Sequence, residues 1–140
     1  MCLIETDLIL AVASPRDKNH ETSLKALRIL KPLLLSPYSL AELDLLISSG
    51  RIKVVLPDFY SSQESLIAYY NINISLPRPT HMDKALALRT QHHLFYFDSL
   101  HAAVAISAEA TLVSFDKKYS SVKELRYLHP SKLQEIPKSS

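Results

Sequence analysis

The sequence predicts an α/β protein with a mostly parallel central sheet flanked by helices. Two observations predict it: short, near-continuous apolar runs are typical of strands buried on both faces, and they alternate along the chain with longer segments of helical periodicity. A third is size, because 140 residues with 47% hydrophobic and 21% charged residues suit one hydrophobic core. We therefore expect a single α/β domain.

The first element is the apolar run over residues 3–12, which is interrupted only by Glu5-Thr6-Asp7. It predicts a buried strand that runs into a short helix. A second helix is expected over residues 20–30, where Leu24, Leu27 and Leu30 share one side and either Asn19 or Thr22 can act as the cap.

The middle of the chain predicts one strand and two helices. Residues 33–35 are three leucines and predict a short core strand. A helix over residues 38–49 follows, and Gly50 is placed to adopt the left-handed conformation at its end. After a connecting segment, Pro57-Asp58 begins another helix, which we expect to extend to about Tyr70.

The second half predicts the remaining elements in the same alternating order. In sequence, we expect a strand over 72–76, a helix to about His92 capped by Thr80, an alanine-rich helix over 98–108, a strand over 111–115 and a last short strand over 126–128. Residues 130–140 are expected to form a loosely ordered tail.

Two residue counts exclude whole classes of protein. The single glycine, Gly50, rules out the glycine-rich loops of dinucleotide-binding and P-loop proteins, which need several glycines against a phosphate. The single cysteine, Cys2, permits neither an internal disulfide nor a multi-cysteine zinc site.

The apolar N-terminus carries two acids and no basic region, and no apolar run reaches the ~18 residues of a membrane span. We expect a cytoplasmic protein outside the membrane.

Two carboxylates, Glu5 and Asp7, lie inside the first apolar run. In an extended strand they would project from the same face, whereas they would diverge if the helix began at Thr6. A buried carboxylate must be paired, protonated or bound to a cation. The alternative for either residue alone is an acid at the strand end that caps the next helix.

Three further acids occupy unusual positions. Glu42 faces apolar neighbours on its helix, Asp98 begins the helix over 98–108, and Asp116 closes the strand over 111–115. Taken singly, they have structural explanations: a pairing with Arg or Lys, a helix cap and a turn, respectively.

Taken together, the acids predict a metal site. Most of them follow a strand or begin a helix, so they can converge on one edge of the sheet. Clustered carboxylates repel one another, and Mg²⁺ or Mn²⁺ is the usual resolution because these hard ions prefer oxygen ligands. Such sites activate water against phosphodiesters, which makes nuclease chemistry the leading interpretation.

Four short blocks also resemble a known family. They are Ile4-Glu5-Thr6-Asp7, Leu40-Ala41-Glu42-Leu43 after Ser36-Pro37, Phe97-Asp98-Ser99-Leu100-His101-Ala102-Ala103, and Val113-Ser114-Phe115-Asp116. In this order they look like a PIN domain of the VapC toxin type, over residues 2 to about 128. The third block is the most specific.

The resemblance implies a fold, an activity and a set of partners. It implies a three-layer fold with a parallel sheet between helices, a nuclease domain over residues 1–129, and a metal-dependent endoribonuclease that cleaves single-stranded RNA. A homodimer and an antitoxin protein are the implied partners, so the chain would be the toxin of a toxin-antitoxin pair.

The resemblance also implies roles for the five acids. By position, Glu42, Asp98 and Asp116 match the acids of the family's metal centre. The family usually has Asp-Thr-Asn or Asp-Thr-Ser in the first block, so Glu5 takes the place of the first acid and Asp7 that of a neutral residue. We expect Glu5 to be the ligand and Asp7 a supporting or alternative one.

Basic residues provide candidates for RNA contact, although the net charge is only +2. They are Lys25 and Arg28 at helical spacing, and Lys117 and Lys118 directly after Asp116. The competing function is a catalytically silent PIN-like module that binds RNA or protein.

The histidines suggest a weaker alternative, a transition-metal site. His92, His93 and His101 lack the spacing of such a site, because adjacent histidines point apart on a helix. They are better explained as surface residues at helix ends.

Overall fold

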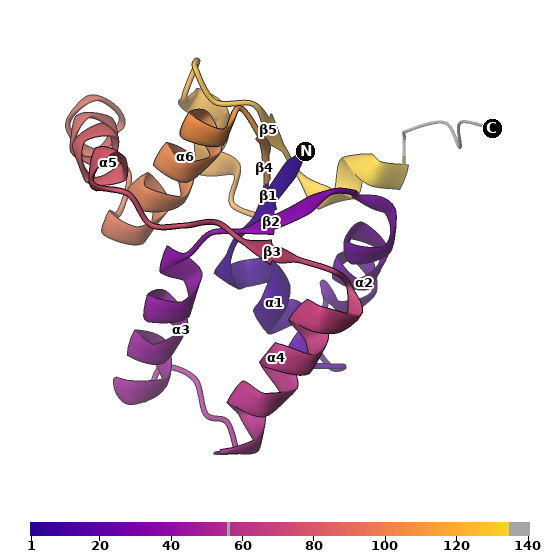
Figure 1. Cartoon of the computed structure of the whole chain (residues 1–140). Coiled ribbons are helices and arrows are strands. Elements are labelled where there is room, and N and C mark those ends of the chain that lie inside the picture. The colour runs from indigo at the N-terminus through magenta and orange to yellow at the C-terminus, as the bar shows by residue number, and fades with distance from the viewer. Residues whose placement is uncertain (56, 135–140) are drawn as a thin grey trace.

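The computed structural model describes residues 1–55 and 57–134. In these residues, parallel strands form one sheet in the order β3-β2-β1-β4-β5 (Figure 1). The strands are β1 (Cys2–Ile4), β2 (Leu33–Leu35), β3 (Asn73–Ile74), β4 (Thr111–Val113) and β5 (Tyr127–Leu128). The helices are α1 (Thr6–Ala13), α2 (His20–Ile29), α3 (Tyr38–Ser48), α4 (Asp58–Tyr69), α5 (Pro79–His92) and α6 (Tyr96–Ala108), with 3-10 helices η1 (Lys117–Ser121) and η2 (Pro130–Gln134).

The strand register brings several strand ends to the same level. Ile4, the last residue of β1, lies opposite Leu35 of β2 on one side and Val113 of β4 on the other, and both neighbours are also last residues. Because all the strands are parallel, the residues that follow them meet at one edge of the sheet. Glu5, Ser36 and Ser114 are these next residues.

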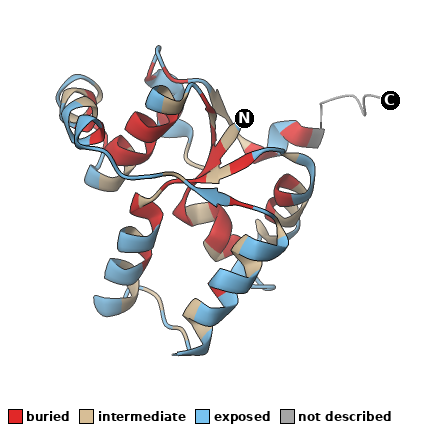
Figure 2. Ribbon diagram, in the orientation of Figure 1, coloured by how far each residue is buried: buried red, intermediate tan, exposed pale blue. Residues whose placement is uncertain are grey.

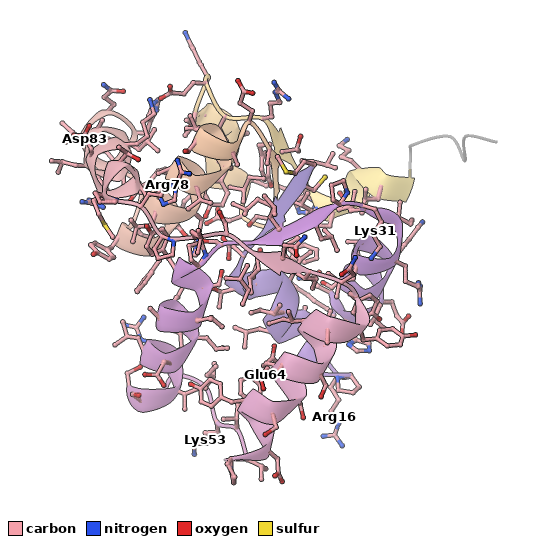
Figure 3. All side chains as sticks on the ribbon, viewed as in Figure 1. Arg16, Lys31, Lys53, Glu64, Arg78 and Asp83 are labelled. Carbon is pink, nitrogen blue, oxygen red and sulfur yellow. The ribbon has the colours of Figure 1, made fainter. Side chains whose placement is uncertain are left out.

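Hydrophobic side chains cover both faces of the sheet, which confirms the three-layer α/β prediction. On one face, Leu3 and Leu112 pack with α5, α6 and η1. On the other, Ile4 and Val113 pack with α1, α2 and Leu133 of η2. Figure 2 shows the buried residues concentrated along the sheet and the inner sides of the helices, while α3 and α4 are largely exposed. The labelled charged side chains in Figure 3, such as Arg16, Lys53 and Asp83, lie at the periphery.

Two helices begin earlier than predicted. Thr80 is not the cap of α5: the helix begins at Pro79 with Arg78 as its N-cap, since proline suits the first helical turn. Similarly, α6 begins at Tyr96, so Asp98 occupies its first turn rather than beginning it. Phe97 therefore lies inside the helix, and its ring stacks on that of His101, one turn further along, with 6.5 Å between the ring centroids. Gly50 has a φ of +77°, as expected for the end of α3.

The segment expected to be a loose tail is ordered in its first part. Residues 130–134 form η2, and Leu133 is buried among the side chains of α1 and α2. The remainder, residues 135–140, lies outside the described residues. In the part of the chain that the structure covers, no helix is both long enough and apolar enough to cross a membrane.

Candidate metal centre

All five acids singled out in the sequence line one cavity of about 220 Å³ at the edge where the strands end. They come from the start of α1, from α3, from the first turn of α6 and from the residue before η1. Thr6, Leu10 and Leu46 complete the lining; the acids are Glu5, Asp7, Glu42, Asp98 and Asp116. The topology therefore brings together residues separated by more than a hundred positions in the sequence.

Glu5 is the most deeply buried acid, with 5% of its surface exposed. It is the N-cap of α1, where its Oε1 accepts a hydrogen bond from the backbone N–H of Asp7 at 3.1 Å. Its Oε2 accepts one from the hydroxyl of Tyr119 at 2.9 Å. Burial raises the pKa of Glu5 to about 7, and the negative charges of Glu42 and Asp98 add to this, while the two hydrogen bonds oppose it. Glu5 thus retains a proton at a pH where an ordinary carboxyl group is ionised.

Asp7 does not share a strand face with Glu5, because the helix begins at Thr6, the residue between them. Its Oδ2 accepts hydrogen bonds from the Ser114 hydroxyl and the Phe115 N–H, both at 2.8 Å, and its Oδ1 accepts one from the Leu8 N–H. Burial and then repulsion from Glu5 raise the pKa of Asp7 well above its usual range. These contacts tie the start of α1 to the end of β4.

Glu42 is held by His101 and Thr6. Its Oε1 lies 2.9 Å from Nε2 of His101 and also accepts a hydrogen bond from the Thr6 hydroxyl. The other ring nitrogen of His101, Nδ1, lies 2.7 Å from the hydroxyl of Ser36 at the end of β2. Burial alone would raise the pKa of Glu42, but the hydrogen bonds and the attraction of His101 outweigh it and lower the pKa below its usual value.

Asp98 and Asp116 form the more open side of the cavity. Asp98 Oδ1 lies 3.3 Å from the Tyr119 hydroxyl, the same group that donates to Glu5. Burial and then repulsion from Asp116 raise the pKa of Asp98. Asp116 Oδ1 accepts a hydrogen bond from the Lys118 N–H at the start of η1. Asp116, for which a turn was the structural alternative, is therefore the N-cap of η1, and it also lines the cavity.

This donor set fits a divalent cation. One ligand atom from each of Glu5, Glu42 and His101 can be chosen so that all three lie within 4.8 Å of one another. Among residues 1–55 and 57–134, no Lys or Arg forms an ion pair with any of the five acids; the salt bridges are Lys84 with Glu124 and His101 with Glu42. The expected pairing of Glu42 with an Arg or Lys is accordingly replaced by His101. Oxygen-rich clusters short of positive charge are the sites that hard divalent ions prefer.

The sequence did not indicate the roles of His101, Tyr119 and Thr6, and the hydroxyl of Thr6 donates to Glu42. The interpretation of His101 as a surface residue is wrong: it is fully buried in α6 and bridges Ser36 and Glu42, whereas His92 and His93 do lie at the end of α5. Tyr119 is 1% exposed and contacts two of the acids. The sequence feature that could have identified Tyr119 is its position three residues after Asp116. A short helix over these residues places the tyrosine near the acids.

The candidate RNA contacts fall at two different places. Lys117 and Lys118 follow Asp116 directly and are exposed, so they lie beside the cavity. Lys25 and Arg28 lie in the second half of α2, which leads into the beginning of β2. That places them toward the opposite edge of the sheet from the acids.

Comparisons with known proteins agree with this architecture. The family model for the PIN domain matches residues 2–125. The structure resembles VapC20 of Mycobacterium tuberculosis, described as a toxin that cleaves the sarcin-ricin loop, with a TM-score of 0.71, 16% identity, and coverage of 90% of this chain and 99% of that one. No curated protein sequence matches significantly.

Two further structures are complexes. VapBC2 of Rickettsia felis, bound to a DNA fragment from its promoter, has a TM-score of 0.68 at 19% identity and covers 91% of this chain and 96% of that one. A toxin-antitoxin complex from Klebsiella pneumoniae also has a TM-score of 0.68, at 17% identity, with coverage of 93% and 98%. At these identities the likeness concerns the fold.

Proposed function

The chain belongs to the PIN domain family, a family of nucleases, and we propose that it is a divalent-metal-dependent endoribonuclease that cleaves single-stranded RNA. One observation carries the proposal: five carboxylates line a single cavity, and none of them is paired with a Lys or Arg of the described residues. A purely structural cluster would be expected to carry such cations.

Glu5, Glu42 and Asp98 would hold the cation, Mg²⁺ or Mn²⁺, with Asp116 on the open side. When bound, the ion supplies an activated water and neutralises the charge that develops on the phosphate. His101 and Thr6 fix Glu42, and Tyr119 fixes Glu5 relative to Asp98. Asp7 would act indirectly, because both of its oxygens already accept hydrogen bonds from α1 and the end of β4.

The substrate strand would be guided by Lys117 and Lys118, which lie beside Asp116. Lysines that contact phosphates release counterions, so RNA affinity should fall as salt rises. We expect Lys117→Ala with Lys118→Ala to flatten this salt dependence, whereas Lys25→Ala with Arg28→Ala should change it less. Equal effects of the two pairs, measured by fluorescence anisotropy, would contradict this arrangement.

The biological role that follows is that of the toxin in a toxin-antitoxin pair acting in the cytoplasm. The supporting observation is that structures sharing the fold over nine tenths of this chain include toxin-antitoxin complexes. An antitoxin protein and a second copy of this chain are the proposed partners.

Cleavage of a labelled single-stranded RNA is the direct test. The purified protein should cut it in Mg²⁺ or Mn²⁺ and stop when EDTA is added in excess. Activity that persists in chelator would indicate a metal-free ribonuclease. RNA binding without cleavage in either metal would instead support the catalytically silent module.

A further inference from the structure

A second, larger cavity adjoins the carboxylate cavity. It has a volume of about 720 Å³ and shares Glu42 and Asp98 with the smaller one. The shared acids place the two cavities next to each other. Its other lining residues come from the end of α3, the following loop and the start of α6: Leu45, Leu46, Arg51, Phe95, Tyr96 and Phe97. A strand bound at the acids would therefore have this second cavity beside it.

The aromatic wall of this cavity is exposed without serving the core. Phe95 and Tyr96 have 67% and 56% of their surfaces exposed, although both are large apolar residues. Their neighbour Phe97 packs against the core and stacks on His101. Since the buried Leu94 and the partly buried Phe97 anchor the segment in the core, Phe95 and Tyr96 keep most of their surfaces free for a ligand.

Cations accompany both exposed rings. Nζ of Lys118 lies 4.1 Å from the centroid of the Phe95 ring, and the guanidinium carbon of Arg89 lies 5.0 Å from that of Tyr96. Arg51 lines the cavity on the side of the loop after α3. Aromatic rings interspersed with cations suit a single-stranded nucleic acid, whose bases stack on the rings while its phosphates approach the cations.

We propose that this cavity binds a nucleobase adjacent to the phosphodiester that is cut, with Phe95 and Tyr96 as its stacking surface. The proposal rests on the ribonuclease function proposed above and adds a substrate subsite to it. A paired base is already stacked in its duplex and cannot enter, so the subsite favours unpaired RNA. A protein segment is the less favoured occupant, because Arg51 and Lys118 attract phosphates and Glu42 and Asp98 would hold the divalent ion that binds one.

Steady-state cleavage in Mn²⁺ tests the subsite with two substrates. One is a single-stranded RNA, and the other is the same strand with abasic residues flanking its cleavage site. Phe95→Ala should raise KM for the intact strand by roughly 5- to 150-fold, the effect of losing one stacked base. It should leave KM for the abasic strand nearly unchanged. Phe95→Trp, which keeps a ring, should restore the intact-strand KM.

Tyr69→Ala is the matched control, because Tyr69 is an aromatic residue on α4 with 81% of its surface exposed, and it does not line the cavity. Its KM values should equal those of the wild type. If the wild type cleaves but Phe95→Ala raises KM equally for both substrates, or for neither, the base subsite is refuted and the apolar wall is left to a protein partner. If the wild type does not cleave either strand, the ribonuclease function itself fails.

Discussion

Glu5→Gln tests the electrostatics of the carboxylate cavity most directly. Burial, reinforced by repulsion from Glu42, raises the pKa of Glu5 from 4.5 to about 7. The folded chain therefore holds this proton more tightly than the unfolded chain does. The stability that the protonated Glu5 contributes is fully present below about pH 4.5, declines as the pH rises toward about 7, and is absent above that pH.

The magnitude follows from these two pKa values. A tenfold difference in proton affinity is worth about 1.4 kcal/mol, so ionising Glu5 costs the folded state about 3 kcal/mol at pH 8. Glutamine resembles the protonated side chain: its oxygen can accept from the Asp7 N–H while its amide donates to the Tyr119 oxygen. The Tyr119 hydroxyl is then free to donate to Asp98, 3.3 Å away. The variant should melt roughly 10 °C above the wild type at pH 8 and within a few degrees of it at pH 4.5.

Thermal unfolding followed by circular dichroism in EDTA, at pH 4.5 and pH 8, measures this difference. Glu64→Gln is the control, since Glu64 is an exposed carboxylate on α4 (Figure 3), and its melting temperature should follow that of the wild type at both pH values. Adding Mn²⁺ at pH 8 should raise the melting temperature of the wild type more than that of Glu5→Gln. A Glu5→Gln protein that is no more stable than the wild type at pH 8, or equally stabilised at both pH values, would refute the reasoning.

Other residues of the cavity give three further predictions. Asp98→Asn and Asp116→Asn should each fold, and they should melt at or above the wild-type temperature because the repulsion between the two acids is relieved. Each should lose at least roughly 100-fold in cleavage rate. Unfolding of Asp98→Asn with normal activity in the folded fraction would contradict a role at the metal. Tyr119→Phe removes a donor to Glu5 and should raise its pKa further, so calorimetry should show weaker Mn²⁺ binding at pH 7 than in the wild type and a smaller difference at pH 9. His101→Ala leaves Ser36 and Glu42 without their shared partner and should lower the free energy of unfolding, measured by urea titration, by about 3 kcal/mol. A loss below about 1 kcal/mol would show that the hydrogen bonds from His101 to these two residues do not stabilise the fold.

The architecture could be predicted from the sequence because most of its helices and strands have a local sequence pattern. Apolar runs predicted β1, β2 and β4, and the position of acids after strand ends predicted where a site would form. Boundaries depend on packing, which local signals do not contain. In the first turn of α6, Phe97 stacks on the buried His101, and in η2 Leu133 is buried; both contacts depend on the tertiary fold.

Partners of the acids were not predictable in the same way. His101 and Glu42 are 59 positions apart, and a histidine in an alanine-rich helix looks the same in sequence whether it faces solvent or a carboxylate. Tyr119 is 114 positions from Glu5. Only the parallel order of β1 beside β2 and β4 brings these side chains to one edge, so the network is a property of the tertiary fold.

The glutamate at position 5, where the family resemblance implies an aspartate, is consistent with the tyrosine at position 119. Because α1 begins at Thr6, the side chain of Glu5 reaches inward from an N-cap position and ends with Oε2 2.9 Å from the Tyr119 hydroxyl. An aspartate there would be one methylene shorter and would leave that buried hydroxyl with Asp98 as its remaining acceptor, at 3.3 Å. A hydroxyl has a single proton to donate, so Tyr119 can satisfy Glu5 and Asp98 together only when one of them carries a proton or both share a cation. The pKa of about 7 for Glu5 is consistent with the first case, and a divalent ion at the cavity would produce the second by displacing that proton.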